Sequence, residues 1–164
     1  MSAAVAILIG LPGAGKSTFY RQRLAATHVV VSKDLLQNAK NKQARQDALT
    51  REALAAGRAV AVDNTNVTPA DRAAIVVIAR EYGARIVAHY IEATTREAVA
   101  RNERREGKAR VPKVAIFTCA KRLVPPSSDE GFDELHVWHA SDGGFVEVGA
   151  VDTRADAPAA DGGG

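Results

Sequence analysis

The sequence predicts an α/β fold in which a doubly wound, mostly parallel sheet of five strands lies between layers of helices. Short apolar runs without polar alternation, typical of strands buried on both faces, alternate with longer segments of helical periodicity. Such alternation indicates parallel strands joined by right-handed helical crossovers. The chain of 164 residues has the length of one domain, which we place at residues 1–149. Residues 150–164 are small, polar and end in glycines, which predicts a disordered tail.

The first apolar run, at residues 5–9, leads directly into GLPGAGKST at residues 10–18. In this spacing glycines let backbone N–H groups approach phosphate oxygens, Lys16 supplies a positive charge, and the Ser17 hydroxyl can ligate magnesium. A helix expected at 16–26 points its positive end at the same anion. The GLPGAGKST motif therefore predicts a three-layer P-loop NTPase fold and a protein that uses ATP and Mg2+. The residues expected to bind the nucleotide are Gly13, Ala14, Gly15, Lys16, Ser17 and Thr18.

The remaining strands and helices are expected to alternate along the chain. Strands are expected at 28–31, 58–62, 84–91 and 134–139, with 145–148 as a short additional strand, and helices at 33–56, 68–82, 95–105 and 112–123. Gly57 is placed to end the helix at 33–56. Thr68 and Pro69 form a strong helix start, with threonine as the N-cap and proline at the first helical position.

Two acidic residues lie where strands are expected to end. Parallel α/β sheets bind ligands at the carboxyl ends of their strands, which selects residues 10–17, 32–34 and 63–66. Asp63 closes an apolar strand and resembles a Walker B acid that holds Mg2+ together with Ser17, although an ordinary turn aspartate has the same spacing. Asp34 is placed to accept a proton from a substrate hydroxyl, although the helix dipole also favours an acid there.

A basic segment at residues 96–113 contains seven basic and three acidic residues around Gly107. Arg101 and Arg105 lie four residues apart on one helix face, so both guanidinium groups are able to reach the same phosphate. A glycine-hinged basic segment suits a lid that closes over the γ-phosphate and excludes water. The alternative is a solvated helix face, the commonest fate of such charge runs.

Composition excludes several classes of protein. No apolar run approaches the roughly 20 residues of a membrane span, and residues 1–9 lack the basic start of a signal peptide. Cys119 is the sole cysteine, so no internal disulfide forms, and the apolar stripe around it predicts a core position. The net charge of +3 is compatible with a polyanionic substrate but lacks the dense basic patch of a general nucleic-acid binder. We expect a protein of the cytoplasm without membrane contact.

Together the motifs resemble the 5′-polynucleotide kinase family, in particular the kinase domain of polynucleotide kinase-phosphatases. They occur in the family's order over about residues 5–140: GLPGAGKST at 10–18, SKD at 32–34, VDNTN at 62–66, Arg72, ARNERRE at 100–106, VP at 111–112 and EGF at 130–132. The resemblance implies that Asp34 is the general base toward the 5′-hydroxyl of DNA or RNA. It implies that Lys16, Arg101 and Arg105 stabilise the transferring phosphoryl group. The residues it places on the substrate side are Lys33, Thr65, Asn66 and Arg72.

The chain departs from the family's pattern in two places. Lys33 stands where the family usually has arginine, and lysine is a point charge without the bidentate fork. The aspartate-rich phosphatase motif of bifunctional members is missing, so no 3′-phosphatase activity is implied. The P-loop, strand-end aspartate and lid arginines are also similar to those of small-metabolite kinases and antibiotic phosphotransferases. Phosphorylation of a small-molecule hydroxyl is therefore the alternative. A nucleotide switch or regulatory ATPase is a third reading, and the absence of an NKxD motif and of an LSGGQ segment argues against it.

Overall fold

The computed structural model describes residues 3–152. Its strands are β1 (Ala4–Ile9), β2 (His28–Val31), β3 (Ala59–Asp63), β4 (Arg85–Ile91), β5 (Glu134–Ser141) and β6 (Gly144–Asp152). Its α-helices are α1 (Lys16–Phe19), α2 (Lys42–Ala55), α3 (Pro69–Glu81), α4 (Thr95–Glu103) and α5 (Lys113–Arg122). The described residues also form three shorter helices. These are the π-helix η1 (Tyr20–Leu24), which continues α1, and the 3-10 helices η2 (Lys33–Leu35) and η3 (Gly107–Ala109).

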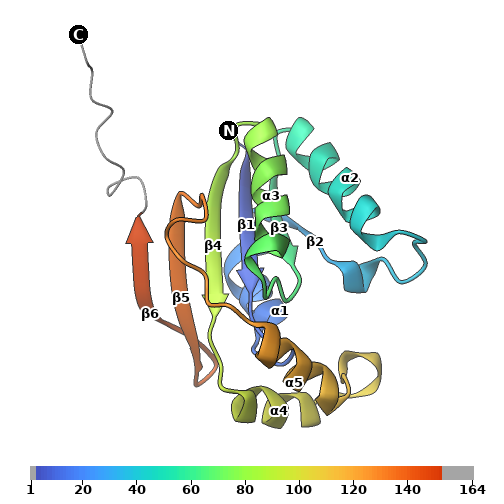
Figure 1. Ribbon diagram of the computed structural model, residues 1–164, viewed down its shortest axis with the longest axis vertical. Helices are drawn as coiled ribbons and strands as arrows, with labels where there is room; N and C mark the ends of the chain where they lie inside the picture. The colour runs from blue at the N-terminus through green and yellow to red at the C-terminus, as the bar shows by residue number, and fades with distance from the viewer. Residues whose placement is uncertain (1–2, 153–164) are drawn as a thin grey trace.

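The sheet has the strand order β2-β3-β1-β4-β5-β6. All neighbouring strands are parallel except β5 and β6, which form an antiparallel hairpin at one edge. Helices α2 and α3 pack against one face, while α1, α4 and α5 lie toward the other (Figure 1). The expected three-layer, doubly wound α/β fold is therefore confirmed, with six strands in the described residues in place of five.

The central strand β1 has neighbours on both sides and helices over both faces. Val5, Ile7 and Ile9 point into the core beneath α2 and α3, whereas Ala6 and Leu8 point into the core beneath α1 and α5. All five side chains are at most 1% exposed, which explains why the run shows no polar alternation. Because β1 is buried on both faces, its position in the sheet is fixed, and so is the point where the glycine-rich segment begins.

The long helix expected at 33–56 is wrong. Its start is the short η2, followed by turns, and α2 begins only at Lys42. The Ser32 hydroxyl accepts a hydrogen bond from the Asp34 N–H at 3.2 Å, and the Asn41 side chain accepts one from the Ala44 N–H at 3.0 Å. Two local side-chain caps therefore divide the segment, because each competes with continuous helical hydrogen bonding.

The helix boundaries predicted at Thr68 and Gly57 are confirmed. Thr68 caps α3 with Pro69 in its first turn. At the start of α4, Thr94 forms a capping box with Glu97. Gly57 follows α2 with φ of 74°, the left-handed conformation that glycine adopts without strain. These caps set where each helix begins or ends relative to the sheet.

The edge strand β6 extends beyond the expected 145–148 and reaches Asp152. The first three residues of the expected tail thus belong to the sheet, and the rest of that tail, residues 153–164, lies outside the described residues. Within residues 3–152, no helix combines the length and the apolar character needed to cross a bilayer.

Candidate active site

The glycine-rich segment forms a loop between β1 and α1 whose backbone is anchored at its start. The Gly10 N–H donates to the Thr65 carbonyl at 3.0 Å, which joins the loop to the end of β3. Gly13 and Gly15 have φ of 85° and 109°, a region that other residues rarely adopt. A Cβ on Gly13 would lie 2.4 Å from the carbonyl oxygen of Ala98 in α4, so this helix contacts the loop directly. Both glycines thus allow a left-handed backbone conformation, and Gly13 also allows α4 to approach the loop closely.

Lys16 lies inside the loop and is only 8% exposed. Its Nζ donates to the carbonyl oxygens of Gly10 at 3.0 Å and Leu11 at 2.9 Å. Burial lowers the pKa of Lys16 from 10.5 to about 8, an effect that the negative charge of Asp63 partly opposes. The loop therefore holds a desolvated ammonium group that backbone dipoles stabilise, and a phosphate oxygen would be a stronger partner for it.

Ser17 and Asp63 meet at the carboxyl ends of β1 and β3. The Ser17 hydroxyl donates to Asp63 Oδ2 at 2.8 Å. Magnesium is usually held by one or two protein oxygens together with substrate phosphates and waters, so a hydroxyl and a carboxylate side by side fit its needs. Among the described residues there is no group of three or more histidine, cysteine or acidic side chains suited to a metal on their own. A metal at this pair therefore depends on the nucleotide for its remaining ligands.

Asp34 follows β2 on η2, and its backbone is held from two sides. Its own N–H donates to the Ser32 hydroxyl, and the preceding N–H, of Lys33, donates to Asn64 Oδ1 at 2.9 Å. The Asn64 Nδ2 in turn donates to Gln46 Oε1 at 2.6 Å, and Gln46 is a buried residue of α2. The carboxylate of Asp34 is thus presented at the surface from a fixed backbone beside the end of β3.

The two arginines expected to form a lid both lie near the loop. Arg101 of α4 donates from Nη1 to the Ala14 carbonyl at 2.9 Å, so α4 is already closed onto the loop. Arg105 donates to the Ala109 carbonyl of η3 at 3.3 Å. Its positive charge also contributes to the lowered pKa of Lys16, which places it within electrostatic reach of that ammonium group. Arg101 therefore contacts the glycine-rich loop directly, and Arg105 lies close enough to Lys16 to act on it through charge.

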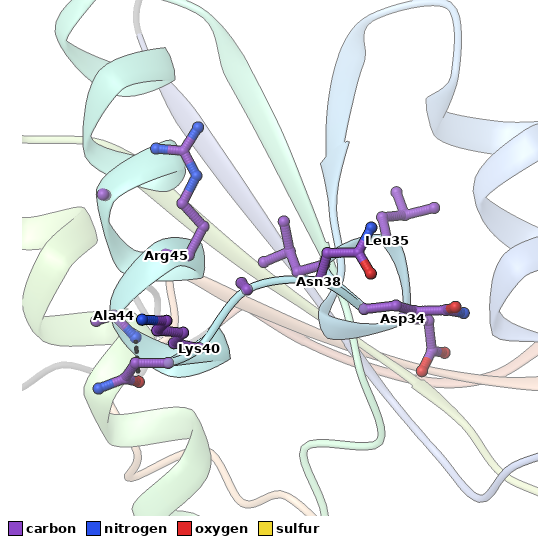
Figure 2. A pocket seen from close by; sticks show the side chains of 11 residues that line it. Asp34, Leu35, Asn38, Lys40, Ala44 and Arg45 are labelled. Atoms are coloured by element: carbon purple, nitrogen blue, oxygen red, sulfur yellow. Dashed lines mark hydrogen bonds between the residues drawn. The ribbon is translucent and has the colours of Figure 1, made fainter.

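Two cavities flank Asp34. The larger, of about 940 Å3, is an open groove between η2 and the start of α2, and Asp34, Leu35, Lys40 and Arg45 line it. Figure 2 shows Asp34 and Arg45 at opposite sides of this groove. The second, of about 430 Å3, is more enclosed and lies between η2, α2, the loop after β3, the start of α3 and the end of α5.

Arg72 does not occupy the place expected of it. Its side chain is fully buried and forms a bidentate ion pair with Glu130, with Nε–Oε1 and Nη2–Oε2 distances of 2.8 and 3.1 Å. Nη1 donates to the Asn66 carbonyl at 2.9 Å. The substrate-side role predicted for Arg72 is therefore corrected to a structural one, since no face of the guanidinium is open to a phosphate.

The other predicted substrate residues divide into two groups. Lys33 and Thr65 line the enclosed pocket. Asn66 also lines it, but its Nδ2 donates to the Leu8 carbonyl at 2.8 Å and its backbone has φ of 47°, so its amide holds the loop to β1. Sequence reasoning missed Asn64, although it lies in the strand-end segment that was singled out. Gln46 and Arg122 also line this pocket, and no local pattern in the sequence predicts them there.

A family of AAA domains, AAA_33, matches residues 5–126 of the chain. A bifunctional polynucleotide phosphatase/kinase from Schizosaccharomyces pombe is 27% identical over 136 residues, which cover 80% of this chain and 32% of that protein. This relative bears out the resemblance to polynucleotide kinases, and the chain spans about a third of its length.

Solved structures share the fold. Kti12 from Chaetomium thermophilum in complex with ADP-AlF3 has a TM-score of 0.69 at 20% identity, over 84% of this chain and 90% of that chain. A gluconokinase from Sinorhizobium meliloti 1021 has a TM-score of 0.61 at 16% identity, over 84% and 83% of the two chains. The chain therefore shares its overall fold with both proteins.

The structural role of Arg72 predicts that Arg72→Ala unfolds at a lower urea concentration, with a loss of about 3–5 kcal/mol, because the change removes a fully buried guanidinium and breaks its ion pair with the partly buried Glu130 carboxylate. Arg51→Ala is the matched control, since Arg51 pairs with Glu81 on the surface, where both side chains are more than 40% exposed. Equilibrium urea denaturation followed by circular dichroism measures both. Equal stability of the two variants would return Arg72 to a surface role.

Proposed function

The chain belongs to the AAA domain family AAA_33, and we propose that within this family it is an ATP-dependent kinase whose acceptor is the 5′-hydroxyl of a polynucleotide. The observation that carries the proposal is the convergence of three strand ends. β1 brings Lys16 in the phosphate-binding loop, β3 brings Asp63 against Ser17, and β2 brings Asp34 to the same edge. These are the groups that phosphoryl transfer needs: a cation, a metal-binding pair and a proton acceptor.

In the proposed reaction the acceptor oxygen forms a bond to the γ-phosphorus while the bond from the γ-phosphorus to the β–γ bridging oxygen breaks, and ADP leaves. The Asp34 carboxylate takes the proton of the attacking hydroxyl. Lys16 exchanges its two carbonyl partners for phosphate oxygens, and Arg101 and Arg105 contribute positive charge from α4. Ser17 and Asp63 would hold Mg2+, which neutralises charge on the β- and γ-phosphates when bound.

The polynucleotide acceptor rests on the motifs shared with polynucleotide kinases and on the 27% identical relative, a bifunctional polynucleotide phosphatase/kinase. The second candidate is a kinase for a small-molecule hydroxyl. The enclosed pocket beside Asp34, of about 430 Å3, favours it because that volume lies in the range of small-ligand sites.

The deciding experiment incubates the protein with γ-labelled ATP, Mg2+ and single-stranded DNA or RNA oligonucleotides that carry a 5′-hydroxyl. We expect label on the 5′ end, and no label on the same oligonucleotides carrying a 5′-phosphate. A panel of polyols, sugars and aminoglycosides runs in parallel. Transfer to one of these with none to any oligonucleotide would establish the small-molecule alternative.

Two substitutions test the central roles. Lys16→Met removes the charge beside the phosphates and is expected to lower kcat by about 10²–10³-fold or more. Asp34→Asn keeps shape and removes the proton acceptor, so we expect a loss in kcat of roughly 10²-fold or more with ATP affinity retained. Single-turnover kinetics and ATP titrations separate the two effects. Unchanged turnover in Asp34→Asn would make Asp34 an ordinary helix-start acid.

Arg101→Ala and Arg105→Ala are expected to lower kcat by about 10²-fold or more with a smaller effect on the KM for ATP, because charge on the transferring group is best matched in the transition state. Arg104→Ala is the control, since Arg104 lies between them in the chain and its side chain is exposed. If all three variants behave alike, the segment is a solvated face.

The lowered pKa of Lys16 predicts proton uptake when ATP binds. In the free protein its pKa is about 8, and phosphate oxygens beside Nζ raise it, so at pH 8 binding takes up about half a proton. The affinity for ATP accordingly falls as the pH rises through 8. Titration calorimetry in buffers of different ionisation enthalpy measures this uptake. Lys16→Arg keeps the charge without titrating, and an equal uptake in that variant would assign the proton elsewhere.

A further inference from the structure

The connection between α4 and α5, which lie side by side, is closed by one buried side chain, that of Asn102 (Figure 1). Asn102 is only 1% exposed. Its Nδ2 donates to the Val111 carbonyl at 2.7 Å, and its Oδ1 accepts from the Val111 N–H at 2.9 Å. One amide thus pairs with both backbone groups of Val111, as a residue of a neighbouring strand would. The two ends of the segment 103–110 are therefore tied together.

The tie joins two parts that are themselves anchored. Val111 packs against the core that contains Ala98 of α4 and Ile116 of α5. An ion pair between Glu103 and Lys113, with an Oε1–Nζ distance of 3.0 Å, spans the same two ends, but its side chains are 46% and 59% exposed. Exposed ion pairs contribute little to stability, whereas the hydrogen bonds of a buried amide are costly to lose. Asn102 is therefore the main link that closes the segment.

The closed segment carries Arg105. Its Nη1 donates to the Ala109 carbonyl at 3.3 Å, so the guanidinium is oriented by the far side of its own segment. Gly107 has φ of 60°, the left-handed conformation that lets the chain reverse between these two residues. Ala109 lies two residues before Val111, so the tie to Asn102 fixes where its carbonyl lies.

Arg105 acts on the glycine-rich loop from this position. Its side chain is half-buried, and its charge contributes to the lowered pKa of Lys16. The start of the segment is held to the same loop, because Arg101 donates to the Ala14 carbonyl at 2.9 Å. A cation contributes most to a reaction when it is held in place before charge develops, and a displacement of about 1 Å can lower the rate about 10²-fold.

We propose that Asn102 is a positioning residue for phosphoryl transfer, which holds Arg105 at the glycine-rich loop by closing the segment 103–110 onto Val111. The inference rests on the proposed function, in which Arg105 contributes positive charge to the transferring group. Because its side chain is buried, Asn102 acts through Arg105 and not on the substrate. Gly107 then serves the turn of a closed segment, and α4, the segment and α5 move as one unit.

A double-mutant cycle tests whether Asn102 acts through Arg105. With a 5′-hydroxyl oligonucleotide as acceptor, Asn102→Ala should lower kcat by about 10-fold or more, with a smaller effect on the KM for ATP. In the Arg105→Ala protein the same change should lower kcat by less than about threefold, because the group that Asn102 positions is absent. Thr50→Val is the matched control: Thr50 is 2% exposed and donates to the Gln46 carbonyl within α2. We expect this control to keep kcat.

Asn102→Asp provides a rescue. A protonated carboxyl group has the shape of the amide, accepts from the Val111 N–H and donates to the Val111 carbonyl, whereas a carboxylate has no proton for the carbonyl. Burial raises the pKa of such a carboxyl group. The kcat of Asn102→Asp relative to the wild-type protein should therefore rise as the pH falls from about 8 to about 5.5. The same ratio for Asn102→Ala should stay flat, because alanine has no group that titrates.

Hydrogen exchange followed by mass spectrometry measures the tie without activity. The amides of residues 104–111 should exchange about 10-fold faster or more in Asn102→Ala than in the wild-type protein, and at the wild-type rate in Thr50→Val. Equal exchange in Asn102→Ala and the wild-type protein would overturn the closure of the segment. Circular dichroism tests folding, and if Asn102→Ala does not fold, Asn102→Asp replaces it in the cycle and in the exchange measurement.

The possible failures have different results. If the wild-type protein phosphorylates 5′-hydroxyl oligonucleotides but Asn102→Ala keeps its kcat, or loses as much without Arg105 as with it, the positioning role is wrong and the proposed function stands. If only a small-molecule hydroxyl is phosphorylated, the polynucleotide acceptor is wrong, and the same cycle with that acceptor decides the role of Asn102. If no acceptor is phosphorylated, the proposed function is wrong and the positioning role falls with it.

Discussion

The site depends on the segment 63–66, which ties three strand ends together. β2, β3 and β1 are adjacent parallel strands, so their carboxyl ends meet at one edge of the sheet. Each residue of the segment makes one tie there: Asp63 to the Ser17 hydroxyl, Asn64 to the Lys33 N–H, Thr65 to the Gly10 N–H and Asn66 to the Leu8 carbonyl. The segment thereby sets the phosphate-binding loop and the proposed base relative to each other, which pre-organises the groups for charge that develops in a reaction.

Positive charge at this edge is concentrated where water is excluded. The Lys16 ammonium is buried among backbone carbonyls, and Arg101 holds α4 against the same loop through Ala14. Such a site favours a polyanion, because desolvated cations gain more from a phosphate than exposed ones do. The same desolvation lowers the pKa of Lys16 to about 8, so the proposed nucleotide binding would depend on pH.

The sequence predicted the features that local chemistry determines. The glycine-rich loop, the buried strands and the cap at Thr68 depend on neighbouring residues, and all are present. Arg72 was misassigned because its partner Glu130 lies 58 residues further along the chain, and burial of such a pair has no local pattern. Arg122 and Asp34 line the same pocket only because α5 packs beside the loop after β3, and such packing has no local pattern either. Contacts between distant segments were therefore the part that the sequence could not supply.

The most direct measurement of the central claim is a structure of the protein with ADP, Mg2+, aluminium fluoride and a 5′-hydroxyl dinucleotide. We expect the aluminium fluoride group to lie between the β-phosphate and the 5′-oxygen of the dinucleotide. Lys16 Nζ should then donate to this group and no longer to the Gly10 and Leu11 carbonyls. The 5′-oxygen should lie within hydrogen-bond distance of the Asp34 carboxylate. A filled nucleotide site with the 5′-oxygen beyond reach of Asp34 would contradict it.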